Sequence, residues 1–168
     1  MKKDGERRRV LILDGSIWEG AYDPARGWRR YLGGVPAESV HLPAGGAVPP
    51  LARFTHLIVT GSEASITAPE PWFEVEARAV REAAAAGMPV LASCFGHQML
   101  ARALSGPEFV RSCPAPEIGW IEVEFHTPDP LLEGIPRRAA CFASHFDEVG
   151  DPPAPWRVLA GTEACPVQ

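Results

Sequence analysis

One short stretch of the sequence combines a cysteine with the small residues that a sharp turn requires: Ala92 stands two positions before Cys94, and Gly96 two after it. The apolar run 89–93 predicts a buried strand, and residues 98–104 predict a helix that follows at once. Small residues at these two positions allow the strand-to-helix turn known as a nucleophile elbow. We therefore predict that Cys94 is a nucleophile at the carboxyl end of a sheet, with strained backbone angles.

The predicted position of Cys94 would favour its reactive form. The partial positive charge of a helix N-terminus stabilises a thiolate, which is the nucleophilic species. The backbone N–H of the next residue, Phe95, would face the place where an oxyanion develops on a carbonyl under attack. The alternative is that Cys94 is simply a small buried residue, and the elbow pattern argues against it.

Five blocks of the sequence, in order, resemble the class I (triad-type) glutamine amidotransferase family, and in particular its stand-alone, GMP synthase-like branch. The resemblance covers nearly the whole chain from about residue 9. The blocks are the elbow PVLASCFGHQ (89–98), LIVTGSEASI (57–66) with Pro71-Trp72, EIGW (117–120), DPL (129–131) and SHFDEV (144–149).

The resemblance implies hydrolysis of the side-chain amide of glutamine, or of a γ-glutamyl compound, through a thioester on Cys94. The released ammonia would pass to an acceptor or to a synthetase partner. The same resemblance implies that the backbone N–H groups of Gly61 and Phe95 form the oxyanion hole. It implies no cofactor and no metal, and the sequence contains no phosphate-binding P-loop.

The resemblance also assigns the residues that hold the amino-acid end of the substrate: Gln98, and Ser144, Phe146 and Asp147 of the 144–147 turn. Several relatives have glycine in place of Phe146, so we expect the pocket wall to differ here. His145 lies within this turn, and we expect it to orient the turn rather than to act as the base.

The family completes its catalytic triad with a His and a Glu from a C-terminal motif of the form F-H-P-E. Residues 95–168 contain no H-x-E or H-P-E sequence, and His97, which follows the nucleophile by three positions, is expected to be structural. We expect that the sequence is a truncated or partly recorded chain. The alternative is a shortened, non-catalytic module that binds a partner.

A second enzyme class with an elbow cysteine, the DJ-1/PfpI-like hydrolases, offers another interpretation. These enzymes place a histidine directly after the cysteine and need a glutamate on an early strand. Here Phe95 follows the cysteine, and Gly15-Ser16 occupies the early turn. The sequence therefore favours the amidotransferase interpretation.

The elements that must position Cys94 are short apolar strands alternating with helices. Strands are predicted at 10–13, 39–42, 57–60 and 89–93, and helices at 23–32 and 71–86. The best helix is 71–86, with Phe73, Ala77, Val80 and Ala84 on one face.

Strands that are apolar throughout and alternate with helices predict an open, mostly parallel, flavodoxin-like sheet with helices on both faces. The last third of the chain is different, because it has no long helical pattern. We expect it to be rich in strands, at 118–125, 139–144 and 157–160.

Composition limits the remaining possibilities. The chain has 168 residues, 46% of them hydrophobic, with a net charge of −5, which fits one globular domain and argues against nucleic-acid or membrane partners. We expect a basic tail at residues 1–8 and a single amidotransferase-like domain at 9–168, apparently lacking its C-terminal His/Glu segment. The four cysteines are too widely spaced for a zinc motif, and free thiols without a secretion signal predict a cytoplasmic protein.

Overall fold

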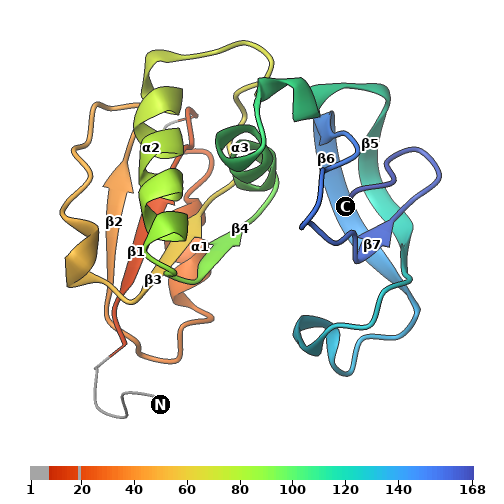
Figure 1. The fold of residues 1–168 in the computed structure, drawn as a ribbon, viewed down its shortest axis with the longest axis horizontal. Coiled ribbons are helices and arrows are strands. Elements are labelled where there is room, and N and C mark those ends of the chain that lie inside the picture. Colours follow the sequence, from red (N-terminus) through yellow and green to blue (C-terminus); the bar gives the residue numbers. More distant parts are fainter. Residues whose placement is uncertain (1–7, 19) are drawn as a thin grey trace.

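Four parallel strands form the central sheet. In the computed structural model, which describes residues 8–18 and 20–168, their order is β2-β1-β3-β4 (Figure 1). The strands are β1 (Val10–Asp14), β2 (Ala37–His41), β3 (His56–Val59) and β4 (Val90–Ala92). The predicted basic tail, residues 1–8, lies outside the described residues except for Arg8.

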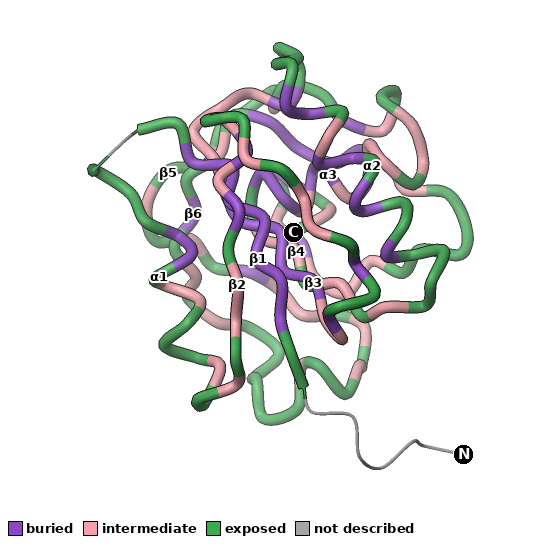
Figure 2. The backbone as a smooth tube through the Cα atoms, turned by 90° about the vertical axis from the view of Figure 1, so that its left-hand side faces the viewer, coloured by how far each residue is buried: buried purple, intermediate pink, exposed green. Residues whose placement is uncertain are grey.

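Helices cover both faces of this sheet, as predicted, and β1 contributes to both interfaces. Its residues Leu11 and Leu13 join the core beneath α2 (Pro71–Ala85) and α3 (Phe95–Leu104). The alternate residues Val10 and Ile12 pack with the side of α1 (Pro24–Arg29). Because both faces are buried, the strand is apolar at every position but the last, and Figure 2 shows it as a continuous buried segment.

Helix α2 presents a different buried face from the one predicted. Phe73, Ala77 and Val80 are buried as expected, but Ala84 is exposed and Ala83 takes its place. The buried face also includes Glu76, whose side chain is completely enclosed. Hydrophobic spacing could not reveal that a charged residue type lies inside the core.

Strand β4 is shorter and less buried than the predicted strand 89–93. Leu91 is 43% exposed, although it pairs in register with Ile58, which packs against the α1 side of the sheet. Since β4 is the last strand in the order, α1 covers the inner strands and leaves this edge position open. The expectation of burial on both faces was therefore wrong for β4.

The C-terminal third forms a second, antiparallel sheet, with the order β6-β5-β7, on the far side of α3 (Figure 1). Its strands are β5 (Val110–Phe125), β6 (Arg138–Val149) and β7 (Ala160–Gly161). The strand-rich character was predicted, but the strand expected at 157–160 was wrong. Pairing begins only at Ala160 because its partner, β5, ends at Phe125.

A membrane-spanning segment was also sought in the described part of the chain. No helix there is both long enough and apolar enough to cross a bilayer.

Candidate active site around Cys94

The turn between β4 and α3 presents Cys94 in a strained conformation. Its backbone has φ 53° and ψ −119°, and it is the only non-glycine residue with positive φ among those described. Such a conformation costs on the order of 1–3 kcal/mol and is typical of functional sites. The predicted elbow and its unusual backbone angles are confirmed.

Gly96 allows α3 to begin directly against the sheet. A Cβ atom at this position would lie 2.5 Å from the carbonyl oxygen of Val59 and 2.8 Å from that of Thr60, at the end of β3. Any side chain would push the helix away from the sheet. The glycine two residues after Cys94 is therefore required by close backbone approach, as the elbow pattern predicts.

The loop after β3 approaches the nucleophile from the other side. A Cβ atom on Gly61 would lie 3.3 Å from the Cβ and 3.7 Å from the Sγ of Cys94. The backbone groups that hydrogen-bond to the thiol and lower its pKa are those of Phe95 and Ser62. Gly61 thus supplies the space, and the second amide beside the sulfur comes from the next residue along the chain.

The pKa of the Cys94 thiol is nevertheless raised above its ordinary value. Burial by neighbouring groups is the largest cause, and the carboxylate of Glu63 adds to it, while the two backbone groups oppose both. The side chain itself remains exposed to solvent. The free protein therefore holds an accessible thiol that is mostly protonated at neutral pH.

Cys94 lies between two cavities. The inner one, of about 180 Å³, is also lined by His97, His145, Cys141 and Cys165. Burial, and to a smaller extent the nearby His145, lowers the pKa of His97, which keeps its imidazole neutral at physiological pH. The inner cavity thus places a neutral imidazole close to the nucleophile.

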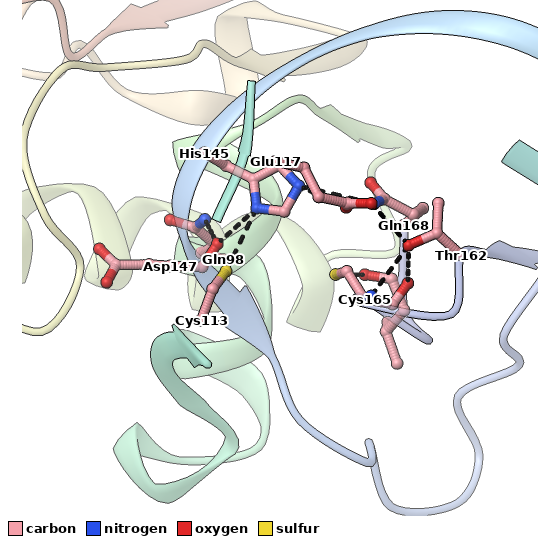
Figure 3. A network of polar contacts seen from close by, with 9 residues as sticks. Gln98, Cys113, Glu117, His145, Asp147, Thr162, Cys165 and Gln168 are labelled. Carbon is pink, nitrogen blue, oxygen red and sulfur yellow. Dashed lines mark hydrogen bonds and ion pairs between the residues drawn. The ribbon is translucent and has the colours of Figure 1, made fainter. Parts of the chain in front are cut away.

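His145 is fixed by a polar network at the back of the inner cavity (Figure 3). Its Nε2 atom lies 3.1 Å from Oε2 of Glu117, and its Nδ1 atom lies 3.2 Å from the carbonyl oxygen of Asp147 and 3.3 Å from Sγ of Cys113. Both ring nitrogens are therefore engaged. This arrangement supports an orienting role for His145 in its turn.

Glu117, His145 and Cys165 bring one metal-binding atom each to within 4.8 Å of one another. Each of these groups already has a protein partner: Thr162 donates to Glu117, and Cys165 lies 3.5 Å from the carbonyl of Val167. Burial raises the pKa of the Cys165 thiol to about 11, and a metal requires the thiolate. The cluster is thus satisfied as a hydrogen-bond network.

The predicted substrate residues Gln98 and Asp147 are tied to each other and to the loop after β3. The side-chain amide of Gln98 donates to the carbonyl of Asp147 at 2.7 Å. The carboxylate of Asp147 accepts hydrogen bonds from Ser65 Oγ at 2.6 Å and Ile66 N at 3.1 Å, and from Ser112 Oγ at 3.2 Å. All three donors belong to the protein, so this carboxylate holds the loop in place.

The outer cavity, of about 420 Å³, opens on the other side of Cys94. One wall is the loop with Glu63, and the opposite wall carries Ser144 and Phe146 from β6. Phe146 is 62% exposed and stands, with the exposed Trp18, among the lining residues. The predicted site residues of the elbow and of the 144–147 turn are therefore brought together in one cavity.

Three residues of the site were not identified from the sequence: Ser62, Glu63 and Glu117. All three lie within the blocks that carry the family resemblance, so their neighbourhood was known. Their individual roles depend on contacts between distant segments, which the sequence pattern does not reveal.

The sequence profile of one family, described as "Glutamine amidotransferase class-I", matches residues 47–167. GMP synthase [glutamine-hydrolyzing] of Aeropyrum pernix is 38% identical over 133 residues, which is 79% of this chain and 24% of that protein. A glutamine-hydrolyzing subunit of the GMP synthase of Pyrococcus abyssi is 35% identical over 81 residues, 48% of this chain and 42% of that protein. The matches thus span less than half of either relative.

Solved structures show the same fold. A glutamine amidotransferase from Thermotoga maritima superposes with a TM-score of 0.81 at 22% identity, covering 95% of this chain and 69% of that one. A second, from Methylobacillus flagellatus, gives 0.79 at 23% identity, covering 96% of this chain and 64% of that one.

Proposed function

Because the chain belongs to the class I glutamine amidotransferase family, we propose that it hydrolyses the side-chain amide of glutamine, or of a γ-glutamyl compound, through a thioester on Cys94. One observation carries this proposal. Cys94 is an accessible thiol on a strained elbow, with the backbone N–H groups of Phe95 and Ser62 directed at its sulfur.

In the first step the Cys94 sulfur attacks the amide carbon. A C–S bond forms, and the carbonyl π electrons move onto the oxygen. The N–H groups of Phe95 and Ser62 are placed to donate to that oxygen, and Gly61 leaves room for it beside the sulfur. Each such donor typically contributes about 10²–10³ in rate.

In the second step the intermediate collapses. The C–N bond breaks, and the nitrogen leaves as ammonia after taking up the proton that the thiol gave up. Water then attacks the thioester carbon, the C–S bond breaks, and the free carboxylate product is released with the thiol restored. Glutamine gives glutamate, and a γ-glutamyl amide gives glutamate and an amine.

Both steps need a group that moves the proton. We assign this role in the present structure to His97, whose neutral imidazole lines the inner cavity with Cys94. Its ring makes no hydrogen bond to any residue in the described ranges 8–18 and 20–168, whereas both ring nitrogens of His145 are engaged. His97→Ala should therefore lower turnover more than His145→Ala lowers it through disorder of its turn.

The roles of the other predicted residues follow from their contacts. Ser144 and Phe146 face the outer cavity and are proposed to contact substrate, together with the free oxygen of the Gln98 amide. Asp147 is better explained as a positioning residue, because its carboxylate is taken up by Ser65, Ile66 and Ser112. This corrects the expectation that Asp147 binds substrate directly.

We also propose that the ammonia passes to a separate synthetase protein, since two of the relatives are named as single subunits of GMP synthase. A cytoplasmic location suits this chemistry, because a reducing compartment keeps Cys94 as a free thiol.

The test is ammonia release from glutamine by the 168-residue chain, with Cys94→Ser as the variant and Cys141→Ser as its matched control in the same cavity. The proposal predicts turnover that Cys94→Ser abolishes and Cys141→Ser retains. Turnover that survives in Cys94→Ser would refute the thioester mechanism.

A further inference from the structure

The outer cavity has an unbalanced charge. Two acidic side chains, Glu63 and Asp147, line it, and no lysine or arginine of the described residues does. The carboxylate of Asp147 already receives three hydrogen bonds from the protein. The remaining negative charge, that of Glu63, has no cationic partner among the described residues that line the cavity.

Glu63 is held in a defined position. Its Oε2 atom accepts a hydrogen bond from the backbone N–H of Ile17 at 2.9 Å. Within the described part of the chain its other oxygen, Oε1, has no hydrogen-bond partner and is available to a ligand. The loop that carries Glu63 is anchored a few residues later, where Asp147 binds Ser65 and Ile66.

This position is unfavourable for the nucleophile alone. The Glu63 carboxylate contributes to raising the pKa of the Cys94 thiol and also that of the Tyr22 phenol beside it. A negative charge near the sulfur disfavours the thiolate that the reaction requires. A bound cation would cancel this effect at the moment when the substrate is present.

The other lining groups also suit a cation. Trp18 and Phe146 are both more than 60% exposed and both line the cavity that contains Glu63. Aromatic faces attract organic ammonium groups through their quadrupole. A carboxylate and two aromatic rings in one cavity form a setting for an alkylammonium group.

We propose that the outer cavity binds an organic ammonium group of the substrate, with Glu63 as its counter-ion, and that this binding favours the Cys94 thiolate. The inference rests on the proposed function, because it concerns the substrate of the same nucleophile. It assigns Glu63 as a specificity-determining residue that selects amides carrying a positive charge.

Two substrates carry such a group. One is glutamine itself, through its α-ammonium group. The other is a γ-glutamyl amide of a diamine, in which the amine half carries a second ammonium group. The chemistry recognised by Glu63 is the same in both, and the two are separated by comparing ligands.

The experiment measures binding by calorimetry in the Cys94→Ala chain, which cannot turn substrate over. The ligands are glutamine, glutaramate (glutamine without its α-amino group) and γ-glutamyl-diaminobutane. The variant is Glu63→Gln, and the matched control is Glu70→Gln, an exposed glutamate that does not line this cavity.

Glu63→Gln should weaken glutamine binding by roughly ten- to a hundredfold, the range for losing a hydrogen bond to a charged group. Glutaramate binding should change by no more than about twofold if the α-ammonium group is the one recognised. If the amine half is recognised instead, only γ-glutamyl-diaminobutane should be weakened. Glu70→Gln should leave all three unchanged.

A second readout uses the thiol directly. Iodoacetamide labelling of Cys94 at graded pH should show the pKa of its thiol moving down in Glu63→Gln, because a raising charge is removed. This measurement needs no substrate, and an unchanged profile would contradict the electrostatic part of the proposal.

Equal losses for glutamine, γ-glutamyl-diaminobutane and glutaramate, or no loss for any of them, would overturn the ammonium site. If the wild-type chain still released ammonia from both glutamine and glutaramate, the proposed function would stand without it. If no ligand bound and no ammonia was released, both proposals would fall.

Discussion

Glu76 gives the sharpest test of the packing, because it is a carboxyl group enclosed in an apolar core. Its side chain is 0% exposed, and neither carboxyl oxygen has a hydrogen-bond partner among the described residues. Burial is the main cause, and the neighbouring Asp14 a further one, that raises its pKa from 4.5 to about 8. The group is therefore protonated in the folded chain at neutral pH.

The direction of the pH dependence follows from this raised pKa. Between pH 4.5 and pH 8 the folded chain holds a proton that the unfolded chain has released, so stability falls as the pH rises through this window. The slope is at most about 1.4 kcal/mol per pH unit. Integrated from pH 6 to pH 8, the loss in the free energy of unfolding is about 2 kcal/mol.

Glu76→Gln removes the titration and keeps the shape of the side chain. Urea unfolding followed by tryptophan fluorescence at pH 6, 7 and 8 should show the wild-type midpoint falling by about 1 M more than that of Glu76→Gln. Glu82→Gln, on an exposed position of the same helix, should behave as the wild type. Parallel pH profiles for the wild type and Glu76→Gln would refute a buried, protonated Glu76.

Three further predictions concern the site. Gly61→Ala should lower kcat/KM at least about tenfold with little change in melting temperature, because the new methyl group would press on Cys94; unchanged kinetics would contradict the close approach. Asp147→Asn should lower the free energy of unfolding by about 1–3 kcal/mol in urea titrations, since the charge-assisted bond from Ser65 is lost. Alkylation of Cys94 by iodoacetamide should accelerate about tenfold per unit between pH 7 and pH 8.5, because its thiol pKa is raised; a plateau in that range would show the opposite.

The elbow could be predicted from the sequence because its rules are local. A small residue, Cys94 and Gly96 fall within five positions, and the close contact of Gly96 with the end of β3 follows from any helix that starts directly after a strand. The parallel sheet followed from apolar runs that alternate with helices, and β1 shows why, since its two sets of alternate residues face different helices.

The network around the site could not be predicted, because it depends on contacts between distant segments. Asp147 and Ser65 are 82 positions apart, and Glu117 and His145 are 28 apart, on different strands. The sequence placed Asp147 correctly beside the pocket but could not show that its carboxylate turns toward the loop after β3. The exposure of Leu91 was missed for a related reason, since a strand's position at the edge of a sheet is a property of the whole topology.

The central claim is that Cys94 is the nucleophile for a γ-glutamyl amide. The most direct measurement is brief exposure of the chain to diazo-oxo-norleucine, an electrophilic mimic of glutamine, followed by peptide mapping of all four cysteines. The account predicts a single adduct on Cys94, since burial raises the pKa of the Cys113 thiol to about 12 and that of Cys165 to about 11. Equal labelling of the four cysteines, or an adduct elsewhere with Cys94 unmodified, would contradict it.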